Sequence, residues 1–277
     1  MATDKTTRAP IFVHGILGRS GTNYLTEMLA LHPACAVSRI PEDWLLAKSE
    51  WLTRYVDAVS KIWRHDAAWE IDADAEDALL RHLGAGLISF LARQAEAKRL
   101  ISKTPDVNEL GNFFRLFPDA YLLVLVRDGR SVVESYIRSF GGDANKIAGW
   151  WARAAGQILD FDRAHGDSTS NYRLIRYEDL VRDPINEMAA LLRFLDLDAQ
   201  DYDFSAIRRL PVFGSSTSRD ASGNWEWTEV PDTGDLGSLE RWSGWSRDQH
   251  EQFNRIAGDR LEQLGYRPLH FPDPAGP

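Results

Sequence analysis

The sequence predicts an α/β fold in which helices flank a parallel β-sheet, with a helical insertion and an extended loop near the carboxyl end. Short apolar runs with the length of buried strands occur at 10–14, 99–103, 120–126 and 172–176. Each run is followed by a segment with helical spacing of apolar residues. Strands that alternate with helices form parallel sheets covered on both faces, so these observations define the fold class.

The first strand, PIFVH, leads into a glycine-rich turn and then into a helix predicted over 22–31. Leu25, Met28 and Leu29 fall on one face of that helix at the spacing of an amphipathic segment. We therefore expect a strand, turn and helix unit at the start of the sheet. In such units the backbone N–H groups of the turn point toward a bound anion.

A helical insertion is predicted from about residue 42 to residue 98, over one edge of the sheet. It is rich in tryptophan, at positions 44, 51, 63 and 69. Because indole rings bury a large apolar area, we expect these tryptophans to pack the core of the insertion. The remaining strands, 99–103, 120–126 and 172–176, then complete the sheet.

The carboxyl-terminal part begins with a segment at 212–240 that has no periodicity and is rich in Ser, Gly, Asp and Thr. Loops of that length in compact domains are often functional, and we expect this one to cover a ligand. A final helix follows, with Phe253, Ile256, Leu261 and Leu264 facing inward. Gly265 ends it. Residues 1–277 are interpreted as a single domain.

Composition excludes several classes of protein. The chain has 32 lysines and arginines against 41 aspartates and glutamates, a net charge of −9, which argues against nucleic-acid binding. No stretch approaches the roughly 18 consecutive apolar residues of a membrane helix, and the polar start lacks a hydrophobic signal core. The single cysteine, Cys35, fits a reducing compartment, so we expect a cytoplasmic protein. The histidines are scattered, and no metal site is predicted.

The glycine turn departs from the usual phosphate-binding loop. That loop has a lysine followed by Ser or Thr after its last glycine, and here no lysine occurs between Lys5 and Lys48. The cation in the turn is Arg19, followed by the hydroxyls of Ser20 and Thr22. The turn is predicted to bind an anion, and a plain packing turn is the alternative.

A second stretch, LLVLVRDGRSVVESYIRSF at 122–140, places Arg127 where a buried strand ends. Ser135 lies eight residues on, about two helical turns, so both side chains can face one ligand. Ligands of open parallel sheets bind beyond the carboxyl ends of the strands. Taken alone, the stretch favours the structural alternative, with Asp128 as a helix N-cap and Arg127 in a surface ion pair.

The segments GRSGTNYL, VRDGRSVVES and RYEDLVRDP, which begin at residues 18, 126 and 176, occur in an order that resembles the sulfotransferases. These enzymes use 3′-phosphoadenosine 5′-phosphosulfate (PAPS). The likeness to tyrosylprotein and carbohydrate sulfotransferases is closer than to the steroid and phenol enzymes. The resemblance implies a P-loop-like sheet and metal-free transfer of a sulfuryl group from PAPS to a hydroxyl, on a small molecule or carbohydrate. One or two insertion tryptophans are available to line an acceptor pocket. A nucleotide-dependent kinase and a non-catalytic nucleotide-binding module are the alternatives.

The resemblance also assigns cofactor contacts. The residues implied for the 5′-phosphosulfate are Arg19, Ser20, Gly21, Thr22 and Asn23. Those implied for the 3′-phosphate are Arg127 and Ser135, and Tyr177 approaches the adenine. In the carboxyl-terminal segments GSS and ERWSGW, the implied contacts are Ser216 and Arg241.

Catalytic roles are implied for Arg19, Lys103 and Glu42. Lys103, in SKTP at a strand end, matches a lysine that stabilises the transition state in the tyrosylprotein enzymes. Glu42 follows His32 and Pro33 and is the candidate base that removes the proton of the acceptor hydroxyl. Asp43 and His14 are alternatives for the base. A solvated lysine and a helix-capping carboxylate are the structural explanations of the same residues.

Overall fold

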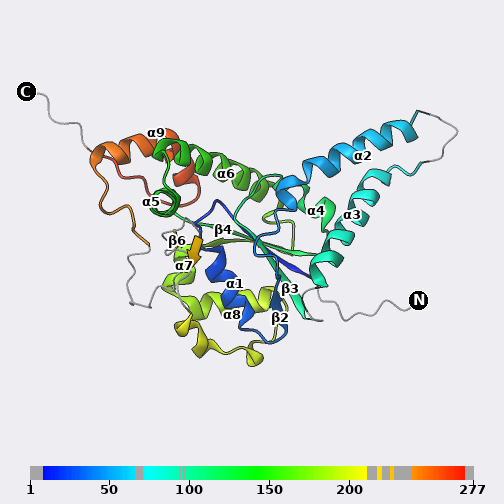
Figure 1. Cartoon of the computed structure of the whole chain (residues 1–277), viewed down its shortest axis with the longest axis horizontal. Helices are drawn as coiled ribbons and strands as arrows, with labels where there is room; N and C mark the ends of the chain where they lie inside the picture. The colour runs from blue at the N-terminus through cyan, green and yellow to red at the C-terminus, as the bar shows by residue number, and fades with distance from the viewer. Residues whose placement is uncertain are drawn as a thin grey trace, which may run out of the picture.

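Five parallel strands form the central sheet of the computed structural model, in the order β2-β3-β1-β4-β5 (Figure 1). The structure describes residues 9–65, 71–93, 95, 98–210, 217–219, 225–227 and 239–271. The strands are β1 Ile11–Gly15, β2 Cys35–Val37, β3 Arg99–Thr104, β4 Tyr121–Val126 and β5 Tyr172–Arg176. Four of them lie where the sequence predicts strands. The fifth, β2, was not predicted, because three residues are too few to show a periodicity.

The helices alternate with these strands. Their bounds are α1 Thr22–Ala30, α2 Glu50–Trp63, α3 Ala75–Ala92, α4 Phe113–Leu116, α5 Gly129–Phe140, α6 Ala144–His165, α7 Tyr177–Arg182, α8 Pro184–Phe194 and α9 Arg247–Gln263. Two further strands, β6 Thr217–Arg219 and β7 Trp225–Trp227, pair antiparallel. They lie within the segment predicted to cover a ligand, which is otherwise almost entirely outside the described residues.

Two apolar cores cover the two faces of the sheet. One contains residues of α1, α7 and α8, such as Met28 and Leu191, and the other contains residues of α3 to α6 and α9, such as Phe113 and Trp151. Figure 1 shows these two groups of helices on opposite sides of the strands. The central strands β1 and β4 are buried on both faces, which explains why they are nearly continuous apolar runs. The carboxyl ends of β1, β3, β4 and β5 all meet at one edge.

The insertion forms two long helices, α2 and α3, which extend together from the edge of the sheet near β3 (Figure 1). Its tryptophans do not all pack as predicted. Trp51 is 66% exposed and Trp44 is 41% exposed, whereas Trp63 is partly buried and Trp69 lies outside the described residues. The reason is that α2 turns the face with Val56 and Ser60 toward the protein, and no described residue covers the face that carries Trp51.

The final helix, α9, begins at Arg247, where Ser246 and Gln249 form a capping box. Phe253 and Leu261 are buried as predicted. The prediction for Ile256 was wrong, because this residue is 38% exposed. The packed stripe follows the i, i+4, i+8 positions from Phe253, and Ile256 falls at its border.

Leu264 is buried next to Gly265, which ends the helical segment with a φ of 81°. No helix in the described part of the chain is long and apolar enough to cross a membrane.

Candidate active site

The turn after β1 leads directly into α1 in a conformation that suits an anion site. Arg19 has a φ of 76° and Gly21 a φ of 99°. A Cβ atom on Gly21 would lie 2.3 Å from the ring of Tyr177, so only glycine fits there. Gly21 is also the N-cap of α1 and provides no side-chain cap. The first N–H groups of the helix are therefore left to solvent or to a bound anion.

Arg19 and Arg127 meet at this turn. Arg127 Nη1 donates to the carbonyl oxygen of Arg19 at 2.9 Å, and Arg19 Nε donates to Ser135 Oγ at 3.3 Å. Arg127 and Ser135 thus face the same turn, as the sequence predicts from their spacing. Their role in ligand binding stays a prediction.

A third guanidinium, that of Arg241, joins them from the carboxyl-terminal segment. Burial lowers the pKa of Arg19 to about 10, and the charges of Arg241 and Arg127 contribute to the same effect. The pKa of Arg241 is also lowered, by burial and then by Arg127, while Glu134 opposes the shift. Lowered pKa values mean that the positive charges are desolvated and crowded. Such a cluster is stabilised by an anion.

The ring of Tyr177 packs against the turn, where it contacts Gly21 and Arg127. Its side chain is 2% exposed, and the guanidinium carbon of Arg127 lies 4.2 Å from its ring centroid. The ring also fills the space beside Gly21. The structure thus places Tyr177 under the anion site, and its predicted contact with adenine is untested.

The other predicted loop residues lie where expected. Ser20 is fully buried, and its Oγ has no hydrogen-bond partner among the described residues. Thr22 is buried and Asn23 partly buried at the start of α1. Ser216 is outside the described residues.

Helix α5 anchors the segment that carries Arg241, residues 239–245. Ser131 Oγ donates to the carbonyl oxygen of Leu239 at 2.7 Å, and the guanidinium of Arg130 lies 3.9 Å from the ring of Trp242. Further along the helix, Glu134 Oε2 accepts from Trp245 Nε1 at 3.0 Å. These three contacts fix the backbone on both sides of Arg241.

Arg130 is itself held by Asp128, the N-cap of α5. Its Nε and Nη2 atoms donate to the two carboxylate oxygens of Asp128 at 3.0 and 2.6 Å, and both side chains are buried. Asp128 Oδ1 also accepts from the Arg130 backbone N–H at 2.9 Å. The N-cap interpretation of Asp128 is therefore confirmed. The surface ion pair is wrong, because Arg127 is 4% exposed.

A buried carboxylate that the sequence analysis missed, Glu178, fixes the end of β4. Its Oε1 accepts from the Asp128 backbone N–H at 2.9 Å, and its Oε2 accepts from the Tyr266 hydroxyl at 2.8 Å. Burial raises the pKa of Glu178, while these hydrogen bonds and Arg127 act in the opposite direction. Its position directly after Tyr177 gave no signal that it would be buried.

Lys103 and Glu42 form an ion pair at the end of β3. Lys103 Nζ lies 3.8 Å from Glu42 Oε1, and the two side chains are 11% and 34% exposed. Burial lowers the pKa of Lys103, although the charges of Glu42 and Glu27 favour its protonated form. Glu27 was not predicted. Burial raises the pKa of Glu27, while the charge of Lys103 acts in the opposite direction. In the sequence, the one indication of this role is that Glu27 is the only acidic residue of an otherwise largely apolar helix.

The two alternatives to Glu42 are held by other groups. Asp43 Oδ2 accepts from Ser102 Oγ at 2.5 Å, and its Oδ1 accepts from the Leu45 backbone N–H at 2.8 Å. His14 Nδ1 donates to the carbonyl oxygen of Asp106 at 2.8 Å, and burial lowers the pKa of this 1% exposed ring. Of the candidate bases, Glu42 is thus the one that lies beside Lys103 and remains partly exposed.

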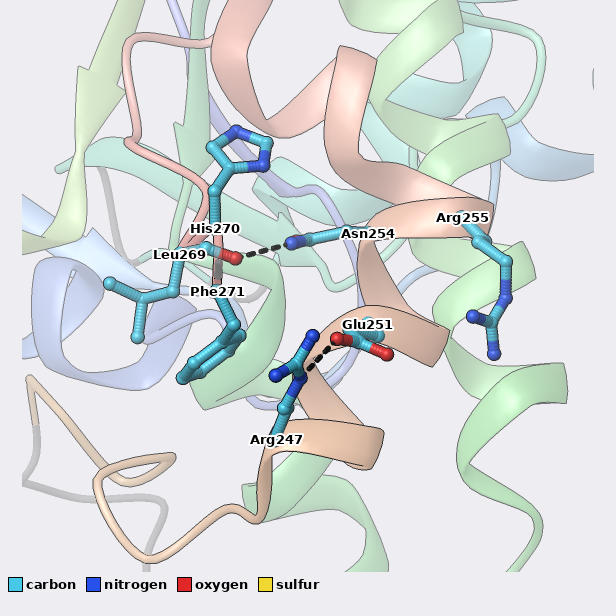
Figure 2. A pocket seen from close by; sticks show the side chains of 7 residues that line it. All are labelled: Arg247, Glu251, Asn254, Arg255, Leu269, His270 and Phe271. Carbon is cyan, nitrogen blue, oxygen red and sulfur yellow. Dashed lines mark hydrogen bonds and ion pairs between the residues drawn. The ribbon is translucent and has the colours of Figure 1, made fainter. Parts of the chain in front are cut away.

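A separate pocket of about 430 Å³ lies beside α9 (Figure 2). Its lining residues are Arg247, Glu251, Asn254, Arg255, Leu269, His270 and Phe271. Within it, Arg247 donates to Glu251 at 2.6 Å and Asn254 donates to the carbonyl oxygen of Leu269 at 2.7 Å. None of these residues belongs to the candidate site. Across the described residues, no three His, Cys, Asp or Glu side chains group in a way that could hold a metal ion.

The fold and the site together define an α/β protein with a cluster of arginines at the carboxyl edge of a parallel sheet. The sequence model described as "Sulfotransferase family" matches residues 10–201, and the chain belongs to that family. The predicted family is therefore confirmed.

Several curated relatives carry the name protein-tyrosine sulfotransferase. Protein-tyrosine sulfotransferase A of Caenorhabditis elegans is 26% identical over 208 residues, which cover 69% of this chain and 50% of the relative. The Drosophila melanogaster protein is 28% identical over 203 residues, 69% of this chain and 38% of the relative. Protein-tyrosine sulfotransferase 1 of Homo sapiens is 26% identical over 276 residues, 95% of this chain and 70% of the relative. The chain thus spans half or less of the length of the Caenorhabditis elegans and Drosophila melanogaster relatives.

Two solved structures share the fold. The sulfotransferase domain of the curacin biosynthetic pathway has a TM-score of 0.58 and 21% identity, covering 94% of this chain and 98% of that one. The sulfotransferase domain of the Synechococcus PCC 7002 olefin synthase has a TM-score of 0.57 and 22% identity, covering 98% and 99%. The predicted fold class, a P-loop-like parallel sheet flanked by helices, is confirmed.

Proposed function

We propose that this protein transfers a sulfuryl group from PAPS to a hydroxyl group of an acceptor. The observation that carries the proposal is the convergence of Arg19, Arg127 and Arg241 at the start of α1. The chain has a net charge of −9, so one buried arginine, Arg127, and two partly buried arginines gathered at one point favour a specific anionic ligand.

Two groups of cations suit the two anionic ends of PAPS. Arg19 and the first N–H groups of α1 suit the 5′-phosphosulfate. Arg127, Ser135 and Arg241 suit the 3′-phosphate. In support, Arg241 Nε is buried without a hydrogen-bond partner among the described residues, and a phosphate oxygen would satisfy it.

The chemistry is an in-line displacement at sulfur. The acceptor oxygen forms a bond to sulfur, the bond from sulfur to the 5′-phosphate oxygen breaks, and 3′-phosphoadenosine 5′-phosphate (PAP) leaves. Glu42 takes the proton of the acceptor hydroxyl. Lys103 and Arg19 stabilise the negative charge that develops on the sulfuryl and leaving oxygens. In the low-dielectric surroundings of Lys103, that stabilisation is stronger than in water.

We propose a small-molecule or carbohydrate acceptor. The curated relatives are named for protein tyrosine, but they are about a quarter identical to this chain. Glu27, Glu42 and Asp43 all act on Lys103 electrostatically, so the acceptor side of the site is acidic. These carboxylates favour a neutral acceptor over an acidic peptide. The single buried cysteine supports a cytoplasmic location, which is also a proposal.

Calorimetry with PAP, ADP and ATP tests the nucleotide half of the proposal. We expect PAP to bind most tightly, and Arg127→Ala to weaken PAP binding by about 2–4 kcal/mol, because a charge-assisted phosphate contact is lost. Circular dichroism checks that the variant is folded. The matched control is Arg173→Ala, which removes an arginine of β5 outside the site.

Each outcome assigns a function. Unchanged PAP affinity in Arg127→Ala refutes the 3′-phosphate assignment. Tighter binding of ATP than of PAP points to a kinase. Tight PAP binding together with no transfer from labelled PAPS to any hydroxyl compound points to a non-catalytic nucleotide-binding module.

A further inference from the structure

Helix α2 carries a row of apolar side chains on its exposed face. Trp51, Tyr55 and Ile62 are 66%, 59% and 65% exposed, and Ala58 between them is exposed as well. These positions follow the i, i+4, i+7 and i+11 spacing, so they form one straight row along the helix. Figure 1 shows α2 extending away from the sheet at the periphery of the molecule. A contiguous exposed row of large apolar side chains is typical of a surface that binds a partner.

A row of charged side chains runs beside the apolar row. Each charged residue immediately precedes a member of the apolar row, so the charged row lies about 100° around the helix from it. Its members, in chain order, are Glu50, Arg54, Asp57 and Lys61. They form two ion pairs within the helix, at 2.5 and 2.7 Å, and their side chains are between 47% and 73% exposed. Exposed pairs of this kind contribute little to stability, so the charges remain available to a partner.

The order of the charges makes this row complementary to a reversed copy of itself. The signs alternate as negative, positive, negative, positive, and reading the row backward exchanges every sign. When a second α2 lies antiparallel, Glu50 lies opposite Lys61 of the second copy, and Arg54 lies opposite Asp57. The two-fold axis of such a pair is perpendicular to both helices and keeps the two charged rows on the same side. The rows therefore face each other with four opposite-charge pairs.

The apolar rows meet in the same antiparallel register. Trp51 lies opposite Ile62, and Tyr55 lies opposite Ala58, so each large side chain at the centre meets a small one. Aromatic side chains bury about 150–250 Å² each, and the two rows together would bury on the order of 1,000 Å². That area is at the lower end of specific protein interfaces. It is the size of a weak dimer that depends on concentration.

The charged row also decides against a lipid surface as the partner. Helices that lie in a membrane interface carry an excess of Lys and Arg on the polar face, which anionic headgroups attract. The charged row of α2 has two positive and two negative members, so its net charge is zero. A lipid surface would match the apolar row alone, whereas a second copy of this chain matches both rows.

We propose that α2 is a dimerisation helix, and that its apolar and charged rows pack antiparallel on the same two rows of a second copy of this chain. The interface is symmetric, so each residue pair occurs twice. The proposal concerns assembly and does not depend on the proposed sulfuryl transfer. It can therefore fail or hold whether or not the protein binds PAP.

Sedimentation equilibrium of the full chain at a series of concentrations tests the proposal. We expect a monomer–dimer equilibrium with a Kd on the order of micromolar. Replacing both aromatic residues, Trp51→Ser with Tyr55→Ser, is expected to raise the Kd by about tenfold or more, because the central contacts are lost. Phe90→Ser is the matched control, since it removes a 52% exposed aromatic residue of α3 outside the row and keeps the wild-type Kd.

Charge reversals test the antiparallel register. Glu50→Lys places two pairs of positive charges across the interface, and Lys61→Glu places two pairs of negative charges there. Each variant alone is therefore expected to raise the Kd by about tenfold. In an equimolar mixture of the two variants, every one of these charges faces an opposite one, and we expect a heterodimer with nearly the wild-type Kd. Circular dichroism checks that each variant is folded.

The outcomes separate this dimer from its alternatives. An effect of a charge reversal within one helix would not be reversed by mixing, so a mixture that stays monomeric overturns the antiparallel register. A wild-type protein that is monomeric at every concentration overturns the dimer, as does a dimer that survives the loss of both aromatic residues. A monomer that binds phosphatidylserine vesicles through Trp51 and Tyr55 would assign the row to a membrane surface instead.

Discussion

At the scale of single residues, the site depends on charges held away from water. Lys103 has an 11% exposed side chain, and burial lowers its pKa even with Glu42 at 3.8 Å. A desolvated cation interacts more strongly with charge that develops during a reaction than an exposed one does. The same desolvation makes its protonation sensitive to alkaline pH.

Lys103→Ala is expected to lower kcat by about 100-fold or more while PAP affinity changes little, because the charge acts in the transition state. Steady-state kinetics and calorimetry measure the two quantities. Lys98→Ala, an exposed lysine just before β3, is the matched control. A near-normal kcat would return Lys103 to the role of a structural lysine.

The pH dependence of this effect has a definite sign. A lysine with a lowered pKa loses its proton at a lower pH than an ordinary lysine, so activity that needs Lys103 protonated falls early as the pH rises. In Lys103→Ala, the residual activity lacks this alkaline decline.

Glu42→Gln is expected to lower kcat by about 10² to 10⁴, because glutamine keeps the size of the side chain but cannot accept the proton. Asp43→Asn is expected to be milder, since Asp43 is engaged by Ser102 and the Leu45 N–H. Kinetics with a screened hydroxyl acceptor and labelled PAPS measure both. The reverse ranking would move the base to Asp43, and two mild variants would point to His14 or to an acidic acceptor.

Much of the residue-level site was predictable and some was not. Arg19, Arg127 and Ser135 come together because the spacing of a strand end and two helical turns is visible in the sequence. Glu27 and Glu178 were missed because their burial depends on which element packs over them. Long-range packing of this kind leaves no periodic signal.

At the scale of elements, α5 connects the proposed nucleotide site to the carboxyl-terminal segment. One part of the helix presents Ser135 to Arg19, and another holds residues 239–245 through Ser131, Arg130 and Glu134. We expect Arg130 to act on the proposed ligand through Arg241, because its guanidinium packs on the ring of Trp242, the next residue in the chain. The strength of its effect should depend on Arg241.

Arg130→Met is expected to weaken PAP binding by about tenfold, because Trp242 loses its stacked guanidinium and Arg241 loses its fixed position. A double-mutant cycle with Arg241→Ala checks this by calorimetry. If Arg130 acts through Arg241, its substitution has little further effect in the Arg241→Ala background. Additive losses would show an independent structural role. Thermal unfolding of each variant is the control for stability.

The elements themselves were predictable in proportion to their length. The strands β1, β3, β4 and β5 and the helix α1 were predicted within a residue or two, because each carries a continuous apolar or helical pattern. The edge strand β2 was missed, and the exposure of Trp51 was not foreseen. In both cases the sequence shows which residues are apolar, but whether they are buried depends on the tertiary arrangement.

At the scale of the whole molecule, charge is distributed unevenly. The chain carries a net charge of −9, yet three of its arginines gather where β1 and β4 end, and three carboxylates lie around Lys103. An acidic protein with a local basic site repels large polyanions and admits a small anion. The composition gives the total charge. The separation into a basic region and an acidic region becomes visible only in the folded structure.

The helices α2 and α3 leave the sheet after Trp44 and return to it at β3, between two fixed points. The Ser38 N–H donates to the carbonyl oxygen of Ile101 and the Asp43 N–H to that of Lys103, so the start of the insertion is tied to the strand that follows it. The helical pair is therefore joined to the sheet through one strand, so we expect that α2 and α3 can be shortened or replaced without moving Glu42 relative to Lys103.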